Sequence, residues 1–154
     1  MISIWRIDKK KNSEITFSGE GAALYAGRWN PKGVRVVYAA QTLALAALEK
    51  FVHLQGVADA ISFVSFKIDV PDSVKIKHVD LSQLPKNWRS VPAPASTQDI
   101  GLNWAQNNET AILRVPSTII PSEYDYLINP LHADFNSLKI SKPLPFSFDP
   151  RMWK

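Results

Sequence analysis

Short runs of apolar residues separated by polar turns and prolines dominate this chain of 154 residues. Runs rich in β-branched and aromatic residues are typical of strands that lie in a sheet. Because proline removes a backbone donor and ten of the eleven prolines fall at or after Pro71, we expect only short elements in the second half. The pattern predicts strands at residues 3–8, 34–40, 60–70, 76–79, 110–115, 123–128 and 138–141.

A different pattern occupies residues 43–54, where nine of twelve positions are apolar. Thr42 is a suitable N-cap and Gly56 stands just past the end, so this stretch predicts a helix. Because the helix has almost no polar face, we expect it to be largely buried.

A second helix is expected over residues 96–106, with Ser96 or Thr97 as its cap. Strands then outnumber helices and do not alternate strictly with them. The prediction is therefore an α+β fold with a mixed or antiparallel sheet and a few helices. The length suits one domain covering residues 1–154.

Composition excludes several kinds of chemistry. There is no cysteine, which removes disulfides, thiolate metal sites and cysteine nucleophiles. The histidines, at positions 53, 78 and 132, form no metal-ligand spacing, so we expect no metal. We find no secretory signal and no apolar run of about 20 residues, so the expectation is a cytoplasmic protein without membrane contact.

The net charge is +4, and the whole surplus lies in residues 1–50, which hold eight basic and four acidic side chains. That is weaker than the clustered charge expected of a nucleic-acid-binding protein. An anionic partner for this third of the chain stays open.

Glu49 is the only acid of the apolar helix. Burial of a carboxylate is costly and raises its pKa, and such sites are often functional. His53 follows one turn later on the same face. The alternatives are a structural Glu–His pair or a carboxylate that reaches water beside Lys50.

The segment Gly27–Gly33 reads GRWNPKG, a loop of defined shape with glycine at both ends. Arg28 offers a bidentate fork for phosphate, and Trp29 offers a flat ring face. The alternative is a tight turn whose tryptophan packs on the core.

Three further polar residues lie at strand ends. Tyr38 can hold a hydroxyl at a pocket mouth, Ser117 can act as a hydroxyl ligand, and Asn129 precedes Pro130. For each, a structural role as a core or turn residue is the alternative.

Taken in order, several stretches resemble the RES-domain family of toxins from bacterial toxin–antitoxin pairs, and the resemblance covers essentially the whole chain. The matching stretches are Trp5–Ile7, Gly27–Gly33, Val36–Ala39, Ala46–Leu54, Val115–Ser117, Leu127–His132 and Phe148–Arg151. The arginine, glutamate and serine of the family's name correspond to Arg28, Glu49 and Ser117, with Arg6 a second candidate for the arginine.

The resemblance implies a fold similar to that of ADP-ribosyltransferases and NAD+ as substrate. Members consume NAD+ by hydrolysis, phosphorolysis or ADP-ribosyl transfer, so the acceptor stays open between water, phosphate and protein. It also implies an Xre-like antitoxin that covers the active site, and it leaves a homodimer open. No direct contact with nucleic acid is expected.

NAD+ cleavage releases neutral nicotinamide and leaves an oxocarbenium-like ribose, which needs a nearby carboxylate. Glu49 is expected to hold the ribose hydroxyls and this charge. Arg28, aided by Arg6, would bind the pyrophosphate. The other expected ligand-binding residues are Tyr38 for nicotinamide, and Ser117 and Asn129 for ribose or phosphate.

Two other functions remain as alternatives. One is a basic nucleic-acid-binding module that uses the N-terminal third, although such a module gains nothing from Glu49. The other is a ribonuclease toxin, for which His53 beside Glu49 would supply acid–base catalysis.

Overall fold

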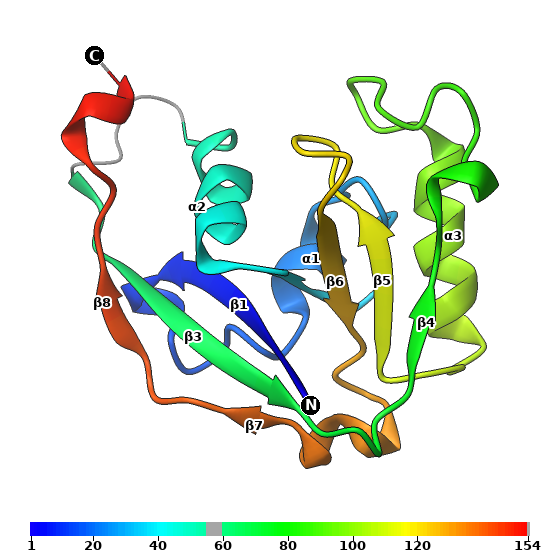
Figure 1. Ribbon diagram of the computed structural model, residues 1–154, viewed down its shortest axis with the longest axis horizontal. Helices are drawn as coiled ribbons and strands as arrows, with labels where there is room; N and C mark the ends of the chain where they lie inside the picture. Colours follow the sequence, from blue (N-terminus) through cyan, green and yellow to red (C-terminus); the bar gives the residue numbers. More distant parts are fainter. Residues whose placement is uncertain (55–59, 154) are drawn as a thin grey trace.

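The computed structural model describes residues 1–54 and 60–153, which form a single eight-stranded sheet crossed by a few helices (Figure 1). The strand order is β4-β5-β6-β2-β1-β3-β7, with β8 also paired to β3. Every pair is antiparallel except β4–β5, which is parallel. The predicted α+β class with a mixed sheet is confirmed. The strands are β1 Ile2–Lys9, β2 Val37–Ala40, β3 Phe63–Val70, β4 Ile76–His78, β5 Ile112–Pro116, β6 Tyr124–Ile128, β7 Lys139–Ile140 and β8 Leu144–Phe146.

The α-helices of the described residues are α1 Glu20–Leu24, α2 Leu43–Phe51 and α3 Ala95–Gln106. Helix α2 packs on β1 and β2, whereas α3 lies on the β4–β5 side. In Figure 1, α2 and the loop that joins β5 to β6 project from the same end of the sheet. Short 3-10 segments lie at Lys10–Asn12, Leu81–Gln83, Ala133–Ser137 and Pro150–Trp153.

The helix expected at 43–54 is confirmed with a corrected end and a corrected environment. Thr42 caps α2, since its side chain accepts a hydrogen bond from the Leu45 amide at 3.0 Å. The helix ends at Phe51, and Gly56 lies outside the described residues. The expectation of a largely buried helix is met only in part, because Leu45 and Ala46 are buried whereas the other residues of α2 are half-buried or, at Ala44, exposed.

Two strands are shorter than predicted because their partners end. The run at 34–40 is a strand only from Val37, which pairs with Ile128, the last residue of β6. The run at 60–70 becomes a strand at Phe63, which pairs with Lys9, the last residue of β1. Strand length is therefore set by the partner and not by the apolar run alone.

Other differences concern local signals. Helix α3 begins at Ala95 with Pro94 as its N-cap, so the expected caps Ser96 and Thr97 are wrong. Strand β8 was not expected, because proline argues against strand pairing and Pro145 lies within it. It is tolerated because β8 lies outside the main strand path and pairs with β3 alone.

Three buried clusters hold the elements together. One, around Ile4, Ile68 and Ile128, lies on one face of the sheet. A second contains Trp29, Trp88, Trp104 and Leu127, and joins α3 to β5 and β6. The third packs Leu45 and Ala46 of α2 onto Ile7 and Ala40. The last two clusters border the polar residues described next.

Candidate active site

Glu49 points into the protein because it continues the buried stripe of α2. Leu45 and Ala46 are the buried residues of the helix, and Glu49 follows them by four and three positions, which places it on the same face. Those apolar neighbours pack on Ala40 at the end of β2. The carboxylate is thus directed toward the strands of the sheet.

Ser117 meets Glu49 at this place. It is fully buried directly after β5, and its hydroxyl donates to Glu49 Oε1 at 2.7 Å. Ser117 Oγ also accepts the backbone N–H groups of Ile119 and Ile120, both at 3.1 Å. A serine hydroxyl has one proton and two acceptor sites, so all of its hydrogen-bonding capacity is used within the protein.

Asp125 is a third member of this cluster, and sequence reasoning missed it. It is 7% exposed on β6, opposite Ala40 of β2 and Val115 of β5, and its side chain is hydrogen-bonded to Glu49. Burial, together with the bond to Glu49 and the charge of that residue, raises the pKa of the Asp125 carboxyl well above its usual value. The signal in the sequence was an aspartate inside a strand of otherwise apolar or aromatic residues.

Tyr38 fixes the loop that carries Arg28. Its hydroxyl accepts the Trp29 amide N–H at 3.1 Å and donates to Asn30 Oδ1. Gly27 leaves the necessary space, since a Cβ there would lie 2.7 Å from both the Tyr38 hydroxyl and Asn30 Oδ1. Burial raises the pKa of the Tyr38 phenol, with Asp125 and Glu49 adding to the effect, so the group stays neutral.

Arg28 is anchored on one side only. Its Nη1 donates to the backbone carbonyls of Trp88, at 3.2 Å, and Ser90. Burial lowers the pKa of its guanidinium, partly offset by Tyr38 and Glu49, which makes Glu49 one of the charges that act on it. Within residues 1–54 and 60–153, Nε and Nη2 make no hydrogen bond, so they can serve a ligand phosphate.

Arg6 differs in this respect, because all three of its nitrogens are engaged. They donate to Thr16 Oγ1 at 2.8 Å, to the Tyr38 carbonyl at 2.8 Å and to Asp8 Oδ2 at 3.3 Å. Burial alone would raise the pKa of Asp8, but Arg6, Thr16 and Lys50 together hold it below its usual value. Arg6 thus ties β1 to the backbone of β2.

Asn129 lies at the other end of β6 from the cluster. It is buried, donates to Asn108 Oδ1 at 3.1 Å and accepts the Leu131 amide at 3.0 Å. It lies four positions after Asp125, about 13 Å at 3.3 Å per residue of strand. The structure therefore brings together Glu49, Ser117, Tyr38 and Arg28, and leaves Asn129 apart.

The structure also decides the expectations for Trp29 and His53. Trp29 is 1% exposed and packs near Trp88 in the core, as the tight-turn alternative supposed. His53 is exposed beyond the end of α2, and among the described residues it makes no hydrogen bond with Glu49. The acid–base pair of the ribonuclease alternative is not formed.

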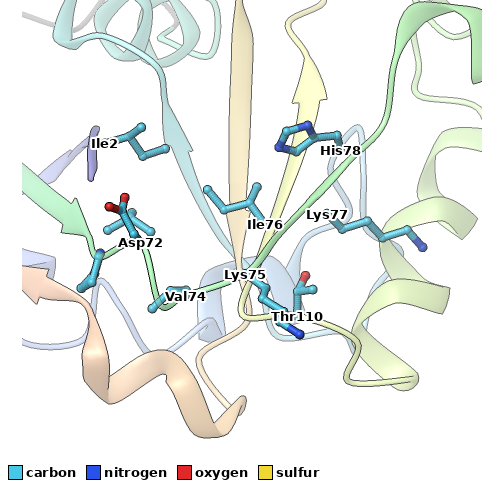
Figure 2. Close-up of a pocket in the computed structure, with 10 residues that line it drawn as sticks. Ile2, Asp72, Val74, Lys75, Ile76, Lys77, His78 and Thr110 are labelled. Atoms are coloured by element: carbon cyan, nitrogen blue, oxygen red, sulfur yellow. The ribbon is translucent and has the colours of Figure 1, made fainter.

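A pocket of about 590 Å³ lies elsewhere, between the start of β1 and β4 (Figure 2). Ile2 and Ile76 point toward one another across it, and Lys75, Lys77 and His78 belong to its rim. None of the candidate residues lines this pocket, so the candidate site is identified from the contacts and charges of its side chains and not from a cavity. In the described part of the chain, no three metal-binding side chains gather, and no helix is long and apolar enough to span a membrane.

The site combines two groups. One is the Glu49 carboxylate, which Ser117 holds by a hydrogen bond, and the other is the Arg28 guanidinium, which has free donors. Such a pair can stabilise a developing positive charge and bind a phosphate of the same ligand. The neutral phenol of Tyr38 fixes the loop of Arg28 through its bonds to Trp29 and Asn30. Fold and site together define the class of protein: a mixed α+β sheet that carries a guanidinium and two carboxyl groups in one cluster.

Comparison with known proteins identifies the family. The profile of the RES domain matches residues 3–149, and the chain belongs to the RES-domain family. A relative named Toxin Res from Yersinia enterocolitica is 41% identical over 150 residues, covering 97% of this chain and 98% of the relative. The Prs ADP-ribosylating toxin of Sphingobium sp. is 40% identical over 154 residues, covering 97% and 96%.

A solved structure supports the fold. The M. tuberculosis MbcT–MbcA toxin–antitoxin complex contains a chain that superposes with a TM-score of 0.74, covering 99% of this chain and 86% of that one. The sequence identity is 16%, so the similarity concerns the fold alone.

Proposed function

We propose that this chain is the NAD+-consuming toxin of a bacterial toxin–antitoxin pair. The observation that carries the proposal is the half-buried Glu49 carboxylate, which is bonded to the buried Ser117 and Asp125 and lies within the electrostatic reach of Arg28. Family membership and the relative named as an ADP-ribosylating toxin support it.

In the proposed reaction, the bond between nicotinamide nitrogen and ribose C1″ breaks, and its electron pair leaves on the nicotinamide, which becomes neutral. The ribose becomes an oxocarbenium-like cation that Glu49 stabilises while it holds the ribose hydroxyls. Water, phosphate or a protein side chain then attacks C1″ and loses a proton. No metal takes part.

The other residues support this step. Arg28 binds the pyrophosphate through its free Nε and Nη2. Tyr38 shapes the nicotinamide side and fixes the Arg28 loop. Arg6 and Asn129, whose side chains are bonded within the protein, contribute to the framework.

The proposal also includes a partner. An Xre-like antitoxin would cover the site and suppress activity; the solved MbcT–MbcA structure is a toxin–antitoxin complex, which supports a partner of this kind. The protein is placed in the cytoplasm, where NAD+ is available.

Glu49→Gln tests the reaction. The substitution removes the charge but keeps the shape, so we expect NAD+ consumption to fall by about 10²–10³-fold, while NAD+ still binds and raises the melting temperature. Glu14→Gln, at an exposed turn, is the matched control and should keep full activity. Equal activity of both variants would contradict the site.

Arg28→Ala should raise the KM for NAD+ through loss of the phosphate contact, with Arg35→Ala, an exposed arginine, as control. Product analysis with and without phosphate separates the acceptors: ADP-ribose indicates water, ADP-ribose-1″-phosphate indicates phosphate, and a mass increase of protein indicates transfer. Intact NAD+ under all conditions would overturn the proposal.

A further inference from the structure

The carboxyl of Asp125 is an unusual group to find in the middle of this sheet. It is 7% exposed, and its cross-strand neighbours, Ala40 and Val115, offer neither a counter-ion nor a donor. Among the described residues, its Oδ1 is buried without a hydrogen-bond partner. A buried carboxylate without such support is costly, whereas the neutral acid is tolerated.

The contact between Asp125 and Glu49 requires a proton. Two carboxylates cannot hydrogen-bond to each other, so one of the two side chains must be the acid. The Ser117 proton is committed to Glu49 Oε1, because the serine oxygen already accepts from Ile119 and Ile120. Ser117 therefore provides nothing for Asp125.

The charges around the pair decide where the proton lies. Glu49 of α2 is the member that Arg28 and the Ser117 hydroxyl support as an anion. Asp125 faces Glu49 itself and the neutral phenol of Tyr38, and its pKa is raised. The proton thus belongs on Asp125, which donates to Glu49.

We infer that Asp125 is a positioning residue that, as a neutral acid, donates a hydrogen bond to Glu49 and holds its carboxylate in place opposite the ribose. The inference rests on the proposed function of Glu49. Ser117, directly after β5, and Asp125, on β6, supply two donors to Glu49, so its carboxylate is held from two sides. Binding of NAD+ involves Arg28 and is not expected to depend on Asp125.

Substitutions of Asp125 distinguish its hydrogen-bond donor from its ability to ionise. Asp125→Val removes the donor, and we expect kcat to fall by about 10- to 100-fold, the worth of one hydrogen bond to a charged group, with KM little changed. Asp125→Asn keeps an N–H donor toward Glu49 and should retain most of the activity. Asp99→Asn, on the exposed side of α3, is the matched control.

The pH profile is the readout that a merely structural role would not change. In the wild type, ionisation of Asp125 as the pH rises through its raised pKa removes the donor and places a second negative charge beside Glu49, so activity should decline there. Asparagine cannot ionise, so Asp125→Asn should lose this decline, whereas Asp99→Asn should keep it. Identical profiles in wild type and Asp125→Asn would overturn the inference.

Stability provides a test that needs no activity. A carboxyl whose pKa is raised in the folded state stabilises the fold at low pH, and this contribution is lost as pH rises from its unfolded pKa through its folded pKa. The melting temperature of Asp125→Asn relative to wild type should therefore increase with pH, and that of Asp99→Asn should not. A constant difference would refute the protonated pair.

The pH profile of activity and the pH dependence of the melting temperature together distinguish failure of the inference from failure of the proposed function. A wild type that consumes no NAD+ at any pH overturns the function, and with it the role of Asp125 in the reaction. The melting temperatures still show whether Asp125 carries the proton of its bond to Glu49. If the enzyme is active and Asp125→Asn matches Asp99→Asn in both measurements, the inference alone is overturned.

Discussion

The hydroxyl of Ser117 has no capacity left for a ligand. It donates to Glu49 and accepts two backbone N–H groups of the loop that follows β5. Its part in the site is therefore to orient the carboxylate and to shape the loop, and a nucleophilic role would require all three bonds to break.

Ser117→Ala should lower both stability and activity. The change leaves the amides of Ile119 and Ile120 without their acceptor and Glu49 without a donor, which should destabilise the protein by about 1–3 kcal/mol. Urea unfolding measures the loss. Ser122→Ala, at an exposed position in the same loop, should stay within about 0.5 kcal/mol of wild type; equal stability of the two variants would argue against the bonding pattern of Ser117.

The residues of the site differ in how far sequence could predict them. Glu49 was prominent because it is the only acid in an apolar helix, and Arg28 because two glycines frame its loop. Family resemblance added Ser117. Asp125 was missed because its importance depends on which strands lie beside it, and no local pattern shows that β2 and β5 both present apolar residues to it. Arg6 and Arg28 look alike in sequence, and only their partners distinguish them.

At the scale of elements, apolar runs located strands well and their ends poorly. The ends depend on partners: β2 starts where β6 stops, and β3 starts where β1 stops. The pairing order itself follows from long-range contacts that no local run encodes. Gly101 within α3 is another example, because the need for glycine there comes from contact with a segment far away in the sequence.

Gly101 is the position where α3 approaches the loop of the candidate site. A Cβ at Gly101 would lie 1.7 Å from the carbonyl oxygen of Trp29, the residue after Arg28. Gly101→Ala must therefore displace α3 or the loop, and we expect a loss of at least about 3 kcal/mol in urea unfolding. Some NAD+-consuming activity should also be lost, since Arg28 moves with Trp29.

The matched control is Gly21→Ala in α1. A Cβ at Gly21 meets nothing within 4 Å, so helix propensity alone should make this variant as stable as wild type or slightly more stable, by about 0.5–1 kcal/mol. If Gly101→Ala proved as stable as Gly21→Ala, the close packing of α3 on Trp29 would be wrong.

At the scale of the whole molecule, part of the basic charge of the first fifty residues is engaged inside the fold. Arg6 and Lys50 both pair with Asp8, at 3.3 and 3.5 Å. Arg28 is different, because within residues 1–54 and 60–153 its Nε and Nη2 make no hydrogen bond while Nη1 is anchored. The surplus thus supports one anionic ligand better than a broad nucleic-acid surface.

Two exposed hydrophobic residues are close in sequence to Arg28 or to a residue that it contacts. Tyr25, three residues before it, is 75% exposed, and Val91, next to the Ser90 carbonyl that Arg28 contacts, is 87% exposed. Single exposed apolar residues are common, but two beside a charged site suit a protein partner that covers it. We expect the chain to be inactive when it co-purifies with its antitoxin and active when freed from it.

Tyr25→Asp and Val91→Asp test where the antitoxin binds. Each places a charge in the expected contact, so inhibition should require at least about 10-fold more antitoxin, while NAD+ consumption without antitoxin stays at the wild-type rate. Leu131→Asp, 71% exposed beside Asn129 at the other end of β6, is the control and should be inhibited like wild type. Titration of NAD+ consumption with antitoxin measures all three. Full activity in the complex would exclude a partner that covers the site, and equal inhibition of all three variants would place the antitoxin on another face.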